Sequence, residues 1–127
     1  MYQHIILIGR LGTDPELRYM DSGQAVCTFS LATSDKWTGK DGAKKEQTTW
    51  WRVTAWGKTG ENVNSFLKKG AQVMVTGKLR PDENGSPRVF QKSDGNWASS
   101  YELTASEVKF LDSKKTSEGA TEDEIAF

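Results

Sequence analysis

Residues 48–58 read Thr-Thr-Trp-Trp-Arg-Val-Thr-Ala-Trp-Gly-Lys, a pattern that indicates a β-strand rich in aromatic residues. Alternate side chains of a strand point to opposite faces of the sheet, so Trp50, Arg52 and Trp56 share one face. The opposite face carries Thr49, Trp51, Val53 and Ala55. One face therefore combines two large aromatic rings with a cation, and the other has the composition of a core or of a subunit interface.

The aromatic and cationic face suits an unpaired nucleic acid strand. Every base has a flat surface that stacks on an aromatic ring, and every nucleotide brings a phosphate for a cation to neutralise. A central strand buried on both sides would show a similar run of large residues, and this strand alone does not separate the two interpretations.

Four further strands and one helix are predicted around this stretch from hydrophobic periodicity and turn residues. The predicted strands cover residues 2–11, 24–33, 72–79 and 101–111, and the predicted helix covers residues 59–70. Residues 12–23 are expected to form a turn region and residues 34–46 a polar loop. Three strands, a helix and two strands in this order predict an all-β OB-fold, a five-stranded Greek-key barrel with one short helix between its third and fourth strands.

Local signals refine three of these elements. Thr59 is expected to cap the start of the helix, and Gly70 to end it in the left-handed conformation. The alternation of apolar residues in the last strand is broken near Ser106, which predicts a β-bulge there. In the first strand neither face is polar, since Ile5 and Ile6 begin two apolar rows, so we expect a second subunit to cover one side.

The charge of the chain is unevenly distributed. The formal net charge is zero, with 17 Lys and Arg against 17 Asp and Glu. Residues 1–111 hold 15 basic against 12 acidic residues, a net charge of +3, whereas residues 112–127 hold 2 against 5, a net charge of −3. We therefore expect a mildly basic domain over residues 1–111 and a disordered acidic tail over residues 112–127.

Residues typical of catalysis are scarce. His4 is the only histidine and Cys27 the only cysteine, so neither a triad with a shared base nor a Cys/His metal site is expected. The carboxylates are expected in turns and in the tail rather than in apolar strands, where a raised pKa would mark a catalytic acid. The predicted protein is not an enzyme and has no metal, no cofactor and no membrane segment.

Aromatic residues with basic neighbours are the candidates for nucleic acid binding. The predicted stacking residues are Trp37, Trp50, Trp56 and Phe90, while Trp51 is assigned to the core or to a subunit interface and Trp97 is left unassigned. The predicted phosphate contacts are Arg18, Lys45, Arg52, Lys58, Arg80 and Arg88. Such contacts bind a strand without reading its sequence.

The last six residues combine acidic and large apolar side chains. They are Glu122, Asp123, Glu124, Ile125, Ala126 and Phe127. A tail that only improved solubility would not need Ile125 and Phe127, so this tip is predicted to dock into a basic-rimmed pocket on a partner protein.

The chain resembles the bacterial single-stranded DNA-binding protein family along nearly its whole length. The matching motifs are residues 6–12 (Ile-Leu-Ile-Gly-Arg-Leu-Gly), 14–19 (Asp-Pro-Glu-Leu-Arg-Tyr), 31–34 (Leu-Ala-Thr-Ser), 46–48 (Glu-Gln-Thr), Trp50, Arg52-Val53, Gly57-Lys58, Lys69-Gly70 and 77–80 (Gly-Lys-Leu-Arg). The resemblance implies a cytoplasmic, nucleoid-associated homotetramer of OB-folds that coats single-stranded DNA during replication, recombination and repair. It also implies that the stacking aromatics are the four named above and that the tail tip recruits proteins of these processes.

This sequence departs from the family pattern at three places. Ala126 stands where the family usually has proline, which gives the tip a looser backbone. The linker between the barrel and the tip is shorter than the long Gly/Gln/Pro-rich linker common in bacterial members, which suggests an accessory, plasmid or phage version or a compact lineage. Residues 81–87 look like an insertion beside residues 88–96, which are expected to form a hairpin that carries Phe90.

Two alternatives from other classes remain open at this point. An OB-fold that binds RNA would use the same stacking residues, because base stacking does not exclude a 2′-hydroxyl. An oligomeric adaptor would use the exposed aromatics for protein contacts and would show no salt-dependent binding of nucleic acid.

Overall fold

The computed structural model describes residues 1–112, which form seven strands and one helix. In chain order these elements are β1 (Ile5–Leu11), β2 (Glu16–Tyr19), β3 (Ala25–Thr38), β4 (Lys44–Trp56), α1 (Gly57–Phe66), β5 (Gln72–Leu79), β6 (Arg88–Gln91) and β7 (Trp97–Phe110). The predicted tail, with Glu122 to Phe127, lies outside the described residues.

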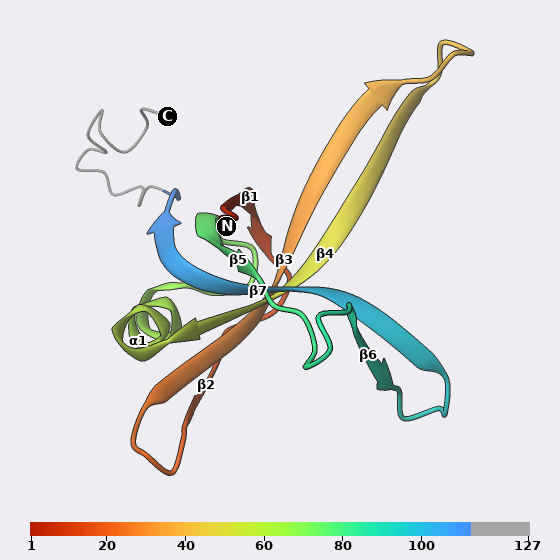
Figure 1. Cartoon of the computed structure of the whole chain (residues 1–127). Coiled ribbons are helices and arrows are strands. Elements are labelled where there is room, and N and C mark those ends of the chain that lie inside the picture. The colour runs from red at the N-terminus through yellow and green to blue at the C-terminus, as the bar shows by residue number, and fades with distance from the viewer. Residues whose placement is uncertain (113–127) are drawn as a thin grey trace, which may run out of the picture.

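Five of the strands close into a barrel. β1 pairs antiparallel with β5 and, through Arg10 and Leu11, with β3. β5 pairs antiparallel with β7, β7 runs parallel to β4, and β4 pairs antiparallel with β3, which completes the ring. The helix follows β4 and precedes β5, at one end of the barrel (Figure 1). This topology confirms the predicted OB-fold.

Apolar side chains from all five barrel strands and the helix fill the interior. Leu31, Val53, Val75 and Leu103 have no exposed surface, and Val63 of α1 is buried against them. The hydrophobic free energy of burying each such side chain is about 2 kcal/mol, so this layer holds the barrel together without a disulfide.

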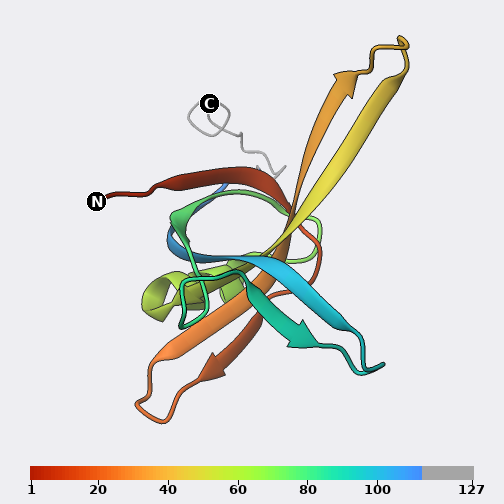
Figure 2. The same cartoon turned by 45° about the vertical axis from the view of Figure 1, so that its right-hand side comes forward.

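Three hairpins extend from the barrel, and they shape its outer surface. β3 and β4 continue well beyond the barrel as a long two-stranded arm, while β2 with β3 and β6 with β7 form two shorter arms (Figures 1 and 2). In Figure 1 the β2–β3 hairpin extends to the lower left of the barrel and the β6–β7 hairpin to the lower right. A nucleic acid strand that passed between these two hairpins would be flanked by both.

Two predicted loops are partly strand, and those predictions were wrong. Residues 12–23 contain β2, whose Leu17 pairs with Cys27. Residues 34–46 belong mostly to the long arm, because β3 runs to Thr38 and β4 begins at Lys44. Polar side chains on both faces hid the periodicity of this arm, since an arm surrounded by water needs no apolar face.

The helix is shifted toward the N-terminus relative to the prediction. It begins at Gly57, Trp56 is its N-cap residue, and the cap makes no side-chain hydrogen bond, so the predicted Thr59 cap was wrong. The helix ends with Leu67 as the C-cap residue. Gly70 does adopt a left-handed conformation, with φ of 92°, but it serves the turn into β5 and donates its N–H to the Leu11 carbonyl at 2.8 Å.

The predicted bulge in β7 is confirmed. Thr76 of β5 faces Glu107, whereas the next residue, Gly77, faces Ala105. Ser106 is therefore the extra residue, and its hydroxyl donates to the carbonyl of Thr76 at 3.0 Å. The bulge curves β7 around the barrel, as closure of a small barrel requires.

β1 is covered on only one side within this chain. Leu11 is buried in the core, but Ile6 and Ile8 on the opposite face are 55% and 51% exposed. The expectation that both sides are apolar is confirmed, and the second side is open in the single chain.

In residues 1–112, helix α1 is too short and too polar to cross a membrane.

Candidate nucleic-acid interface

The alternation predicted for β4 is present and sets the geometry of the site. Val53 and Ala55 have no exposed surface, while Trp50 on the opposite face is 55% exposed and Arg52 is exposed. Trp56 lies at the end of the same row and is half-buried. The outer face of β4 therefore presents an aromatic, a cation and a second aromatic in line along the strand.

A cleft of about 530 Å³ lies across this row between the two shorter arms. Its lining is Arg18, Met20, Val26, Thr28, Arg52, Thr54, Trp56, Arg80, Arg88, Phe90 and Glu102. Four arginines thus surround two aromatic rings, and residues from β2, β3, β4, β6 and β7 meet here although they are far apart in sequence. Six of the predicted binding residues are brought together in this one cleft.

An ion-pair cluster forms part of the cleft wall. Oε1 of Glu102 lies 3.7 Å from Nη1 of Arg80 and 3.6 Å from Nε of Arg88. Nη1 of Arg80 also donates to the hydroxyl of Thr54 at 3.4 Å, which helps to cover that buried threonine. These contacts hold two cations within the cleft rather than leaving them free in solvent.

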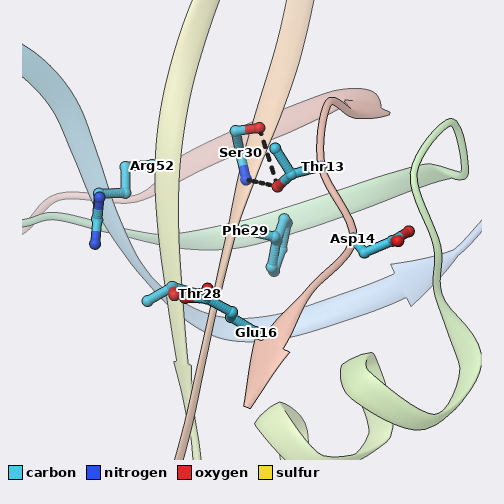
Figure 3. A pocket seen from close by; sticks show the side chains of 7 residues that line it. All are labelled: Thr13, Asp14, Glu16, Thr28, Phe29, Ser30 and Arg52. Atoms are coloured by element: carbon cyan, nitrogen blue, oxygen red, sulfur yellow. Dashed lines mark hydrogen bonds between the residues drawn. The ribbon is translucent and has the colours of Figure 1, made fainter. Parts of the chain in front are cut away.

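A second, smaller hollow of about 270 Å³ adjoins the cleft at Arg52, which lines both. Figure 3 shows its lining, with Asp14 at one end, Arg52 at the other and the Phe29 ring between them. Between them, the hydroxyl of Thr13 accepts hydrogen bonds from the backbone N–H and the hydroxyl of Ser30, both at 3.4 Å (Figure 3). Arg52 therefore stands between two concave surfaces, and a phosphate at either would lie within its reach.

Trp37 and Lys45 occupy a separate place on the long arm. They face each other across β3 and β4 and line a hollow of about 480 Å³. The register of β3 and β4 has no shift, so Trp37 and Lys45 lie on the same face of the sheet as Trp51, opposite to the face of Trp50. A strand that contacted both Trp37 and the cleft would have to follow the twist of the arm.

Lys58 is the one predicted basic contact in residues 1–112 that lines none of these three hollows. It lies in the first turn of α1 and is exposed. Trp51 is half-buried and donates its indole N–H to the Thr33 hydroxyl at 3.1 Å. Its ring packs against Tyr101 in a tilted arrangement, with ring centroids 5.4 Å apart and planes 39° apart. Trp97 is exposed on β7 and pairs with Gln91, so it lies on the hairpin face opposite Phe90.

Sequence reasoning missed Glu102. Carboxylates were expected in turns and in the tail, and that expectation was wrong for this residue, which lies within β7 opposite Arg52 of β4. A signal was available, because Ser100, Glu102 and Thr104 form a polar row that alternates with Tyr101 and Leu103. The partners Arg80 and Arg88 could not be read from that row.

Chemistry other than binding finds little support in the described part of the chain. No group of three or more His, Cys, Asp or Glu in residues 1–112 is placed to hold a metal ion. Burial raises the pKa of the Cys27 thiol to about 11, with a further contribution from the charge of Glu16. A thiol with such a pKa stays protonated at neutral pH and is a poor nucleophile.

Comparison with known proteins agrees with this geometry. A family model described as the single-strand binding protein family matches residues 2–111. A single-stranded DNA-binding protein of Neisseria meningitidis is 40% identical over 115 residues, which cover 91% of this chain and 63% of that protein. Single-stranded DNA-binding protein 1 of Xylella fastidiosa is 43% identical over 110 residues, which cover 86% of this chain and 76% of that protein.

Solved structures show the same architecture. An SSB of Plasmodium falciparum in complex with ssDNA superposes with a TM-score of 0.72 at 28% identity, covering 88% of this chain and 97% of that chain. A deletion mutant of the single-stranded DNA binding protein from Thermus aquaticus superposes with a TM-score of 0.67, also at 28% identity, covering 86% of this chain and 50% of that chain.

The match with the Neisseria protein spans less than two thirds of that relative, whereas the family model covers nearly all the residues described here. The family motifs fall on barrel strands and adjoining turns, on β2, on the long arm and at the start of α1. The chain belongs to the single-strand binding protein family.

Proposed function

We propose that this protein binds single-stranded DNA without sequence specificity, through base stacking and phosphate contacts. The observation that carries the proposal is the cleft on the outer face of the barrel, where Trp56 and Phe90 lie among four arginines. Family membership and the ssDNA in the complex of the Plasmodium SSB support the same substrate.

In this proposal the bases stack on the aromatic rings. Trp50, Trp56 and Phe90 receive bases at and beside the cleft, and Trp37 receives a base on the long arm. Each stacked base contributes about 1 to 3 kcal/mol, so a few such contacts account for tight binding. Every base has a stacking face, and this is why the interaction does not select a sequence.

Arginine and lysine side chains neutralise the phosphates. Arg18, Arg52, Arg80 and Arg88 act within the cleft, and Lys45 acts beside Trp37. Lys58 is assigned a more peripheral contact, because it is exposed on α1. The protein has no catalytic role in this proposal: it covers the strand and releases it unchanged.

The proposed assembly is a homotetramer. The row formed by Ile6 and Ile8 on β1 is exposed in the single chain, and an apolar strand face of this kind favours burial against a second copy. The half-buried Trp51 and the exposed Tyr101 offer a second surface of the same character. Tetramerisation would present four clefts to one long strand.

The acidic tail is proposed to recruit other proteins. Residues 1–111 form the binding domain, and residues 112–127 form a tail whose tip, residues 122–127, docks on proteins of replication, recombination and repair. Its run of three acidic residues, followed by Ile125 and Phe127, supports docking to a basic-rimmed apolar pocket.

A fluorescence titration tests the central proposal. The protein is titrated with a long unstructured thymidine strand at low and at moderate salt, and tryptophan emission is followed. Stacking predicts strong quenching with a sharp stoichiometric end point, and phosphate contacts predict an affinity that falls as salt rises. A matched ribonucleotide strand used as competitor separates DNA binding from RNA binding, and the absence of any quenching at low salt would refute the proposal.

A further inference from the structure

We propose that Glu102 is an internal competitor of the DNA backbone, which limits the affinity of the cleft by occupying Arg80 and Arg88. This inference rests on the proposed binding of single-stranded DNA and adds to it a residue that sets the strength of binding. Glu102 is the only carboxylate among the residues that line the cleft.

The position of Glu102 on β7 directs its side chain toward the binding face. Its neighbour across the sheet is Arg52 of β4, on the outer row that also carries Trp50 and Trp56. Directly paired residues of neighbouring strands share a face of the sheet. Ser100, two residues away on that face, pairs with Arg88 of β6 and donates its hydroxyl to Oε2 of Glu102 at 3.0 Å.

One carboxylate oxygen serves both arginines. Oε1 lies 3.7 Å from Nη1 of Arg80 and 3.6 Å from Nε of Arg88, and the Glu102 side chain is only 10% exposed. Water and salt screen the charge of such an enclosed carboxylate much less than that of an exposed one. The three side chains together carry a net charge of +1 where two free arginines would carry +2.

The arginines nevertheless keep donors for a ligand. Both contacts with Glu102 are longer than a good N–H to oxygen hydrogen bond. Nε of Arg88 is buried and, among the described residues, has no hydrogen-bond partner. An unsatisfied buried donor is destabilising, so a rearrangement that let a phosphate oxygen accept this hydrogen bond would recover that cost.

The phosphate and Glu102 therefore act on the same two guanidinium groups with the same sign of charge. The strand must displace a fixed carboxylate from the two guanidinium groups, so each arginine contributes less to binding than its full charge would. This arrangement suits a protein that has to hold a strand and later release it.

The substitution E102Q tests the inference, because glutamine keeps the shape and removes the charge. We expect E102Q to bind a thymidine strand about fivefold more tightly at about 0.1 M salt, with a salt slope steeper by about 0.7, the value for one additional phosphate contact on a single strand. E107Q is the matched control: it removes one charge from the same strand at an exposed residue that pairs with Lys109 and does not line the cleft.

The tighter binding of the thymidine strand by E102Q must depend on Arg80 and Arg88. In the R80M/R88M background, we expect E102Q to bring no more tightening than E107Q does. A second variant covers the case in which E102Q does not fold. E102D keeps the charge but draws the carboxylate back from both guanidinium groups, and we expect it to bind the strand more tightly than the wild-type protein.

Unchanged or weaker binding by a folded E102Q would overturn the inference, as would unchanged or weaker binding by E102D. If the wild-type protein does not bind the strand at any salt concentration, the proposed function itself fails and this inference fails with it. Normal wild-type binding with no gain in E102Q overturns the inference alone.

Discussion

The indole of Trp50 lies directly against Gly12, so closely that a Cβ on Gly12 would come within 2.3 Å of Cζ3 of the ring. Gly12 follows the last residue of β1, and its N–H donates to the carbonyl of Ser30 at 2.9 Å. This contact, made by two residues 38 positions apart in the sequence, fixes where the exposed indole stands on the binding face.

The substitution G12A should therefore weaken binding of single-stranded DNA by displacing Trp50. We expect a loss of about 1 to 2 kcal/mol in binding free energy, up to the value of one stacked base, measured by fluorescence titration with a thymidine strand. In the W50A background the same substitution should have little further effect. Equal losses in both backgrounds would show that Gly12 acts on something other than the indole.

The β6–β7 hairpin should bind DNA with only one of its faces. F90A is expected to cost about 1 to 3 kcal/mol in binding, because Phe90 lines the cleft. V89A, which changes the exposed neighbour on the opposite face, should leave the affinity unchanged. A loss in V89A as large as that in F90A would contradict the orientation of the hairpin.

The exposed apolar face of β1 should hold the proposed tetramer together. I8E places a charge in that face and is expected to convert the assembly to smaller species, because burying an unpaired carboxylate costs several kcal/mol. Molar mass measured by light scattering after size exclusion provides the readout. S22E, which adds the same charge in the turn between β2 and β3, should leave the mass unchanged.

The hydrogen bond from Trp51 to Thr33 should stabilise the base of the long arm. W51F keeps most of the ring packing on Tyr101 but removes the indole donor, which leaves the Thr33 hydroxyl without this partner. We expect the free energy of unfolding to fall by about 1 kcal/mol in urea denaturation. An unchanged unfolding midpoint would mean that water replaces the indole at no cost.

Cys27 should make the protein less stable at high pH. The thiol has a pKa of about 11 in the folded chain, against an ordinary value of 9.0, so its contribution to stability is complete below pH 9 and is lost as the pH rises toward 11. The size of this contribution is about 3 kcal/mol. The variant C27A should lose this part of the alkaline fall in unfolding free energy, although it is less stable at neutral pH because a cavity replaces the sulfur.

Local sequence determined the order of the five barrel strands and the helix and the chemistry of the binding face, although not β2, the outer part of the long arm or the start of the helix. The alternation in β4 predicted which side of the strand carries Trp50, Arg52 and Trp56, and the broken alternation in β7 predicted the bulge at Ser106. These features depend on a two-residue period and on turn residues, which are properties of neighbouring positions. The order of strands and helix was then enough to predict an OB-fold.

The contacts that make the cleft were decided only by the closed barrel. Arg80, Arg88 and Glu102 come from different strands and hairpins, and their meeting at one carboxylate oxygen depends on the register of β6, β7 and β4. The fit of Trp50 on Gly12 likewise depends on how the chain after β1 passes the long arm. Such registers are fixed by the burial of the whole core, and no local pattern in the sequence encodes them.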